Sequence, residues 1–195
     1  MSSSDTPSRR NARRAFAAEY EDATHRFTEQ DGKQAPRYQL LPTGQRANRL
    51  FVVGTLIEVE TRSNGDWYRS RIADPTGSFG VIAGEDSPRF VRTTLQQVDP
   101  PAFVSVVAKT GRYEPDDGPP RTTLRAESLT STSESTRDRW IIDTADRTAD
   151  RLKQFDDPAN EYVRMVRDQY DPDVDQYRRA ALKAVEELQA TENAN

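Results

Sequence analysis

Five β-prone runs lie between residues 45 and 131, and a helix-compatible run separates the third from the fourth. They are rich in Val, Ile, Thr and aromatic residues, and the segments "SNG", "DPTG" and "PDDGPP" between them carry turn residues. The five runs are residues 49–60, 66–73, 78–84, 102–114 and 121–130. The sixth run, residues 87–98, has the apolar spacing of an amphipathic helix. This order of elements constrains the fold more than any other feature of the chain.

The β-β-β-α-β-β order predicts an all-β OB-fold barrel of five strands with a helix between strands 3 and 4. An SH3-like barrel is the main competitor, but it lacks a helix at that place. Gly54 interrupts the first run, as glycine does at a bulge or a barrel corner. We therefore assign residues 45–131 to an OB-fold domain.

The flanking segments predict helices on both sides of the barrel. In residues 1–44, the apolar residues from Ala12 to Phe27 have helical spacing, and an extended linker follows this amphipathic helix. Residues 132–195 form an acidic helical region in which two Asp-Pro pairs predict helix starts at Asp157 and Asp171. Because residues 132–137 form a polar hinge, we expect residues 36–135 to fold alone.

Composition excludes several chemistries. The chain has no cysteine and a single histidine, His25, so we expect no disulfide, no His/Cys metal site and no cofactor. No glycine-rich phosphate loop, nucleophile elbow or zinc pattern is present, and we expect no enzymatic activity. No apolar run reaches transmembrane length, which predicts a soluble cytoplasmic protein that makes no membrane contact.

The charged residues are of unusual types. Nearly all basic residues are arginine, aspartate outnumbers glutamate, and the net charge is -4 at pH 7. Such an acidic, lysine-poor chain is typical of salt-in halophilic archaea. Near molar salt the Debye length is only about 3 Å. A nucleic-acid-binding protein would then depend on contact hydrogen bonds and stacking.

The stretch "WYRSRIADPTGSFGV" supplies the best candidate site. Side chains alternate along a strand, so Trp67, Arg69 and Arg71 share one face. OB folds bind oligonucleotides on the face of strands 2 and 3 and on the loop between strands 4 and 5. Alternatively, Trp67 covers a barrel end and the arginines pair with Glu58 or Glu60. The candidate nucleic-acid-binding residues at the second hairpin are Lys109, Arg112, Tyr113, Arg121 and Arg125.

The terminal segments supply candidate partner-binding residues. Their helices have apolar faces, and the acidic C-terminal region favours contact with protein over contact with DNA. The candidates are Phe16, Tyr20, Phe27, Tyr162, Val166, Tyr177 and Leu188.

Four segments resemble one known family. "YQLLPTGQRANRLFVVGTLIEVE", "WYRSRIADPTGSFGV", "PAFVSVVAK" and "TRDRWIIDTADRTADRLKQF" are similar to the haloarchaeal replication protein A-associated proteins. These are single-OB accessory subunits of the archaeal single-stranded-DNA-binding complex. The resemblance extends from "ARRAFAAEY" to about Phe155. It departs after "AG", where the family has a Gln- and Tyr-containing stretch and this chain has "EDSPRFVRTTL".

The resemblance implies a role in DNA replication, repair and recombination. It implies a nucleoid-associated hetero-oligomer with a larger replication protein A-like subunit, and single-stranded DNA as the ligand. The alternative is a protein-interaction scaffold of that complex with no DNA contact of its own.

Overall fold

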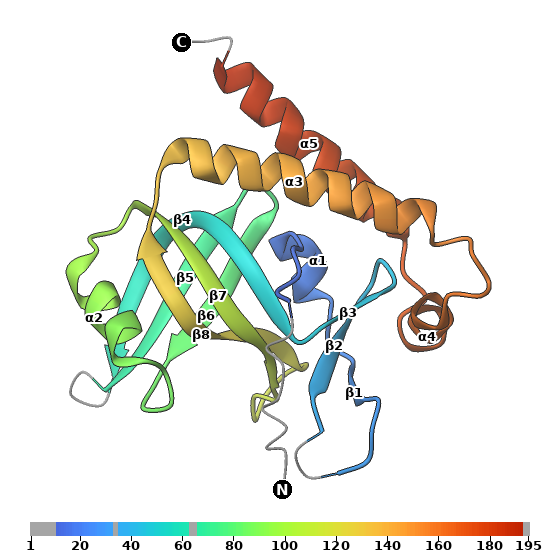
Figure 1. Cartoon of the computed structure of the whole chain (residues 1–195), viewed down its shortest axis with the longest axis horizontal. Coiled ribbons are helices and arrows are strands. Elements are labelled where there is room, and N and C mark those ends of the chain that lie inside the picture. Colours follow the sequence, from blue (N-terminus) through green and yellow to red (C-terminus); the bar gives the residue numbers. More distant parts are fainter. Residues whose placement is uncertain (1–10, 33–34, 63–65, 193–195) are drawn as a thin grey trace, which may run out of the picture.

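A closed five-stranded barrel forms the centre of the molecule (Figure 1). The computed structural model describes residues 11–32, 35–62 and 66–192. The barrel strands are β4 (Arg49–Arg62), β5 (Trp67–Asp74), β6 (Gly77–Ala83), β7 (Ala102–Tyr113) and β8 (Arg121–Ser131). They pair in the order β4-β5-β6-β8-β7. Only the β6–β8 pairing is parallel. Helix α2 (Arg89–Gln97) joins β6 to β7. The predicted OB fold is confirmed.

The long strand β4 pairs with β7 along one edge and with β5 along the other. At Gly54 an added Cβ would come within 2.9 Å of the Ile72 side chain on β5, so only glycine permits the close approach of these strands. The register with β5 then shifts between Leu56 and Glu58. The predicted irregularity in this strand is therefore present, just beyond the glycine.

Helix α3 (Glu134–Lys153) crosses one end of the barrel, and α5 (Val174–Glu192) packs on α3 (Figure 1). Trp140 of α3 is only 2% exposed, and its indole Nε1 donates to the carbonyl oxygen of Phe51 at 2.8 Å. The ring of Phe16 meets Trp140 edge-on, with 5.7 Å between centroids. The aromatic side chains of two distant segments therefore close this end of the barrel.

The predicted helix over residues 12–27 is wrong. Only α1 (Ala17–Glu21) is helical, and Arg13 instead forms a parallel bridge with Leu50. Strand β1 (Arg26–Thr28) joins β2 (Arg37–Leu41) and β3 (Gln45–Ala47) in a separate three-stranded sheet. The apolar residues of this segment have helical spacing, but they pack against different elements of the fold.

Neither Asp-Pro pair lies at a helix start. Helix α4 (Glu161–Gln169) is capped by Asn160, whose Oδ1 accepts from the backbone N–H groups of Tyr162 and Val163. Before α5, the Oδ1 of Asp173 accepts from the N–H of Asp175. Each helix therefore begins two or three residues later than the Asp-Pro pattern predicts, because the nearest side chain with correct cap geometry takes the position.

One hydrophobic core joins the three parts of the chain. It contains Phe16 and Tyr20 from the N-terminal segment, the barrel interior, Trp140 of α3 and Ala184 of α5. Residues 36–135 alone would lose these side chains. The loss of these side chains counts against the prediction that residues 36–135 fold alone. A second, smaller core lies between β2 and α4. No helix in the described part of the chain combines the length and the apolar character needed to cross a bilayer.

Candidate nucleic-acid interface

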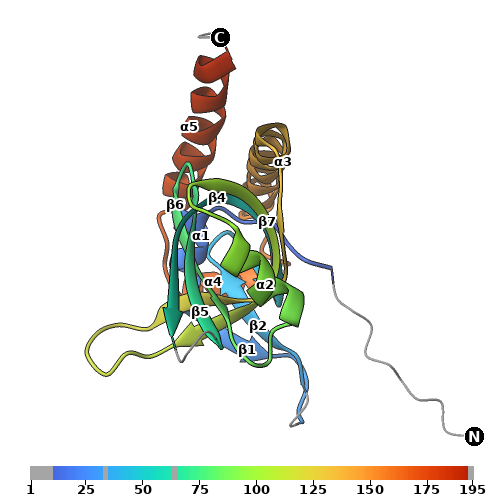
Figure 2. The same cartoon turned by 90° about the vertical axis from the view of Figure 1, so that its left-hand side faces the viewer.

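The outer faces of β4, β5 and β6 form the floor of a groove of about 1130 Å³. The β7–β8 hairpin, which extends away from the barrel in Figure 2, lies along one side of this groove. Helix α1 and the residues after it line another part of the groove. The principal lining residues are Tyr20, Glu21, Asp22, Thr24, Glu58, Glu60, Arg62, Trp67, Arg69, Arg71, Ile82, Tyr113, Pro119, Pro120, Arg121 and Thr123.

Strand β5 alternates as its sequence predicts. Tyr68, Ser70 and Ile72 are buried in the barrel, and the side chains between them face outward. Trp67, Arg69 and Arg71 therefore all line the groove. Of the residues predicted on the second hairpin, Tyr113 and Arg121 also line it.

Trp67 is held in place at the end of β5. A Cβ added at Gly84 would lie 3.0 Å from Cδ1 of Trp67, so the glycine makes room for the indole to lie against the backbone. The guanidinium of Arg62 lies over the ring, 5.5 Å from its centroid. Such cation–π contacts contribute about 0.5–1 kcal/mol at exposed sites. Arg62 is not among the residues predicted from the sequence. Its signal is the pairing of the two strands of this hairpin, which places Arg62 opposite Trp67.

The groove arginines differ in their partners. Arg71 lies 3.7 Å from Glu58 and donates to the hydroxyl of Ser78 at 3.2 Å. Because both charged groups are about half exposed, this pair contributes little to stability. Within the described residues, Arg69 and Arg121 have no ion-pair partner. The alternative reading, in which carboxylates of β4 neutralise the arginines, therefore holds for Arg71 and not for Arg69.

Lys109, Arg112 and Arg125 do not line the groove. Lys109 of β7 lies 3.8 Å from Glu127 of β8, and Arg112 contacts Glu114. Arg125 lies 3.5 Å from Asp86, but it pairs in register with Ile82, which does line the groove. The structure therefore brings the predicted β5 residues together with Tyr113 and Arg121 in one groove, and Lys109, Arg112 and Arg125 lie outside it.

Most predicted partner-binding residues pack within the chain. Phe16, Tyr20, Val166 and Tyr177 are buried, and Leu188 packs against the main core. Phe27 and Tyr162 pack against each other beside the second core, with 6.3 Å between their ring centroids. These apolar faces are therefore used to hold the terminal segments on the barrel, and an exposed surface for a partner must use other residues.

Tyr20 supports the hairpin from inside. Its hydroxyl donates to the carbonyl oxygen of Thr123 at 2.8 Å and accepts from the N–H of Gly111 at 3.2 Å. Burial raises the pKa of Tyr20 well above its usual value, and the hydrogen bond with Gly111 offsets only part of that effect. Tyr20 stays protonated and joins β7 to β8 where the hairpin leaves the barrel.

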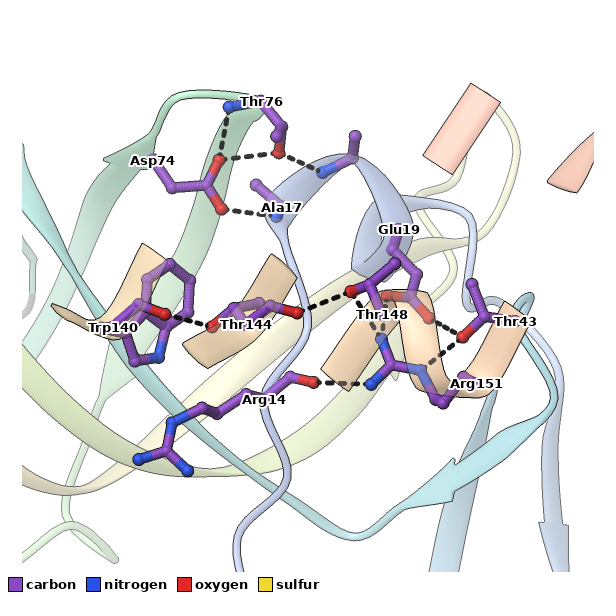
Figure 3. A network of polar contacts seen from close by, with 11 residues as sticks. Arg14, Ala17, Glu19, Thr43, Asp74, Thr76, Trp140, Thr144, Thr148 and Arg151 are labelled. Atoms are coloured by element: carbon purple, nitrogen blue, oxygen red, sulfur yellow. Dashed lines mark hydrogen bonds and ion pairs between the residues drawn. The ribbon is translucent and has the colours of Figure 1, made fainter. Parts of the chain in front are cut away.

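The "DPTG" turn holds the start of α1 (Figure 3), and residues of α1 line the groove. Oδ2 of Asp74 accepts from the N–H of Ala17 at 2.7 Å, and Oγ1 of Thr76 accepts from the N–H of Ala18 at 3.1 Å. Burial raises the pKa of Asp74, and hydrogen bonds from Thr76, Ala17 and Gly77 partly offset the increase. The turn thus caps a helix that lies 57 residues earlier in the chain.

Comparisons with known proteins support the fold. No family model and no curated protein matches the chain. A chain in the crystal structure of the S. pombe Stn1-Ten1 complex has 13% identity and a TM-score of 0.51, over 60% of this chain and 81% of that one. A chain of a Replication Protein A heterotrimer bound to ssDNA has 11% identity and a TM-score of 0.45, over 64% and 88%.

A third solved structure is Rim1, a mitochondrial single-stranded DNA binding protein from S. cerevisiae, with 20% identity and a TM-score of 0.35, over 44% of this chain and 94% of that one. At these identities the likeness concerns the fold. The barrel topology and the similarity to the S. pombe chain define this protein as an OB-fold protein.

Proposed function

We propose that this chain is an accessory OB-fold subunit of a replication protein A-like complex and binds single-stranded DNA along the groove. The main support is that Trp67, Arg69 and Arg71, on the outer face of β5, line the same groove as Tyr113 and Arg121. The subunit acts in the cytoplasm at the nucleoid, in replication, repair and recombination. Its resemblance to haloarchaeal accessory subunits supports a hetero-oligomer, and so does its fold likeness to a protein solved in the Stn1-Ten1 complex.

The charges of the groove favour short-range contacts. Four arginines line it, and four carboxylates, those of Glu21, Asp22, Glu58 and Glu60, line it as well. The groove therefore has little net positive field to attract a distant strand. Stacking of a base on an aromatic side chain contributes about 1–3 kcal/mol and does not need that field. A base on Trp67, with Arg69 and Arg121 at the phosphates, fits this arrangement.

Replacing Trp67 tests the proposal. Trp67→Ala should weaken binding of oligo(dT) by about 1–3 kcal/mol, whereas Trp67→Phe should lose much less because a stacking surface remains. Arg69→Ala should remove a smaller, salt-dependent contribution. Fluorescence anisotropy of labelled oligo(dT) measures each affinity at two salt concentrations. Phe90→Ala on α2, which removes another exposed aromatic outside the groove, is the matched control.

A complementary measurement uses the two tryptophans. Trp140 is buried beneath α3, so quenching of the emission by oligo(dT) reports on Trp67. Unchanged affinity of a folded Trp67→Ala protein at both salt concentrations would eliminate this face as the DNA site.

The alternative function is an interaction scaffold. Ile142 on α3 and Leu182 on α5 are 48% and 58% exposed, although most apolar residues of these helices are buried or half-buried. These two side chains, rather than the buried stripes, are the candidate contacts for a partner. If Ile142→Asp and Leu182→Asp abolish copurification of the larger subunit while Trp67→Ala leaves DNA binding of the complex intact, the scaffold function is favoured.

A further inference from the structure

Four arginines from four strands gather where the small sheet meets the barrel. We call Arg26 of β1, Arg37 of β2, Arg112 of β7 and Arg125 of β8 the arginine cluster. The register places Arg26 opposite Gln39, and Nε2 of Gln39 donates to the carbonyl oxygen of Gly111 at 2.9 Å. Since Gly111 directly precedes Arg112, this hydrogen bond brings β1 and β2 against β7.

A second contact fixes Arg37 at the same place. Nδ2 of Asn48 donates to the carbonyl oxygen of Arg37 at 2.7 Å, and the carbonyl oxygen of Asn48 accepts from the N–H of Thr110 at 3.0 Å. Asn48 thus links β2 to β7 two residues before Arg112. Hydrogen bonds from the side chains of Gln39 and Asn48 to backbone carbonyls therefore help to hold the strands of the cluster together.

The cluster has few carboxylates to neutralise it. Within the described residues, Arg26 and Arg37 have no ion-pair partner. Arg112 and Arg125 pair with Glu114 and Asp86, whose side chains are 70% and 85% exposed. Nε of Arg112 is buried and has no hydrogen-bond partner among the described residues.

The charges of the cluster also act on the titratable groups beside them. Partial burial, and then the positive charges of Arg37, Arg112 and Arg125, lower the pKa of Arg26. Partial burial and the charge of Arg112 likewise lower the pKa of His25. Like charges brought together in this way repel one another, and an anion bound among them would remove that repulsion.

The cluster continues the groove. Thr24 lines the groove two residues before Arg26, and Ile82 lines it beside Arg125. A strand that leaves the groove past Thr24 and Ile82 would therefore meet the cluster next, at Arg26 and Arg125.

We propose that the arginine cluster is a phosphate-binding extension of the groove, which holds the phosphodiester backbone of single-stranded DNA as the strand leaves past the β7–β8 hairpin. This inference rests on the proposed function. Arginine suits the task because its planar guanidinium donates two parallel hydrogen bonds to a phosphate. The site adds a sequence-independent, salt-dependent contribution beyond the stacking on Trp67.

The test compares oligonucleotides of two lengths. The variant carries both Arg26→Gln and Arg37→Gln. The probes are oligo(dT) of about six and about eighteen nucleotides, one within and one beyond the roughly 4–16 nucleotides that one OB fold covers. Each phosphate contact contributes about 0.7 to the logarithmic salt slope for single strands. The slope for the longer probe should therefore fall by about 1.4, which is about sevenfold in affinity over a fourfold salt range. The short probe should bind the variant as it binds the wild type.

Controls separate charge from position. Arg139→Gln with Arg147→Gln makes the same charge change on exposed positions of α3 and should leave both probes unaffected. Circular dichroism must show every protein folded over the salt range used. Trp67→Ala should weaken the binding of both probes.

Three results would count against the inference. An Arg26→Gln, Arg37→Gln protein that binds the longer probe with wild-type affinity and slope overturns it, and the Trp67→Ala effect then still supports the groove. Equal losses for the double variant and for the α3 control also overturn it, because the effect is then one of net charge. A wild-type protein that binds neither probe overturns the proposed function as well.

His25 provides an independent readout, because it is the single histidine of the chain. Its pKa, followed by NMR, should lie below 6.5 in the free protein and rise when the longer probe neutralises Arg112. The short probe should leave it unchanged. A pKa that does not move with the longer probe at saturation contradicts phosphate binding at the cluster.

Discussion

Arg151 and Glu19 form an ion pair that is almost completely buried. Nη2 of Arg151 donates to Oε2 of Glu19 at 2.7 Å, and Nε donates to the hydroxyl of Thr43 at 2.6 Å (Figure 3). Thr43 in turn donates to Glu19, and Nη1 of Arg151 donates to the carbonyl oxygen of Arg14 at 3.3 Å. The desolvated charges are thus fully hydrogen-bonded. Such a pair adds little net stability, but removal of one partner leaves a buried charge.

Breaking this pair should therefore be costly. Glu19→Ala should lower the free energy of unfolding by about 3–5 kcal/mol, and the double variant with Arg151→Ala should lose less than the sum of the single changes. Urea denaturation of the four proteins in the cycle measures the coupling. Lys153→Ala, which removes an exposed pair with Asp150, should change stability by less than about 1 kcal/mol. Strict additivity in the cycle would contradict the role assigned to the pair.

The residues whose positions the sequence predicts differ physically from the residues whose positions it does not predict. The alternation over Trp67 to Ile72 is local, because each side chain's face follows from its position in one strand. Arg151 and Trp140 have no comparable local signal. Their burial depends on Glu19 and on the carbonyl of Phe51, which lie 132 and 89 residues away.

At the scale of elements, the five barrel strands and α2 were predictable because each has its own pattern and turn residues. Helix α1 was not, because it is five residues long and Phe16 at its N-cap offers no side-chain hydrogen bond. Asp74 and Thr76 of a distant turn satisfy its first N–H groups instead. The helix therefore depends on the barrel, which supplies those hydrogen-bond acceptors.

Removing one acceptor tests this dependence. Thr76→Val keeps the shape of the side chain and removes the hydroxyl that accepts from Ala18, so stability should fall by about 1 kcal/mol. Hydrogen exchange at the Ala18 amide should accelerate as well. Thr93→Val on α2 removes an exposed hydroxyl that donates to the carbonyl of Arg89 and should be nearly neutral. Equal effects of the two changes would rule out a capping role for Thr76.

At the scale of the molecule, the terminal segments complete the barrel. Tyr177 of α5 donates to Oδ2 of Asp22 at 2.7 Å, and Ala181 and Ala184 belong to the main core. Asp22 also lines the groove. The C-terminal helices therefore support the segment that forms one part of the groove.

Deletion of residues 157–195 should lower the melting temperature, because it exposes the face of α3 that α5 covers. The full chain should unfold in one transition, with circular dichroism and Trp140 fluorescence changing together. The matched control is a chain that ends at residue 192, which retains all of α5. A 1–156 protein that melts at the temperature of the full chain would show that the helices are an independent attachment.

The pairing of Glu19 with Arg151 also affects the order in which contacts can form while the protein is synthesised. A ribosome adds roughly 5–20 residues per second, so Glu19 is added to the chain roughly 7–26 s before Arg151. During that interval the nascent barrel has no Trp140 to cover Phe16 and no cation for Glu19. Before α3 is made, the N-terminal segment has its barrel contacts, such as the bridge of Arg13 to Leu50 and the hydrogen bonds of α1 with Asp74 and Thr76, but not its contacts with α3. Synthesis of α3 then supplies Trp140 and Arg151, which complete the burial of this segment.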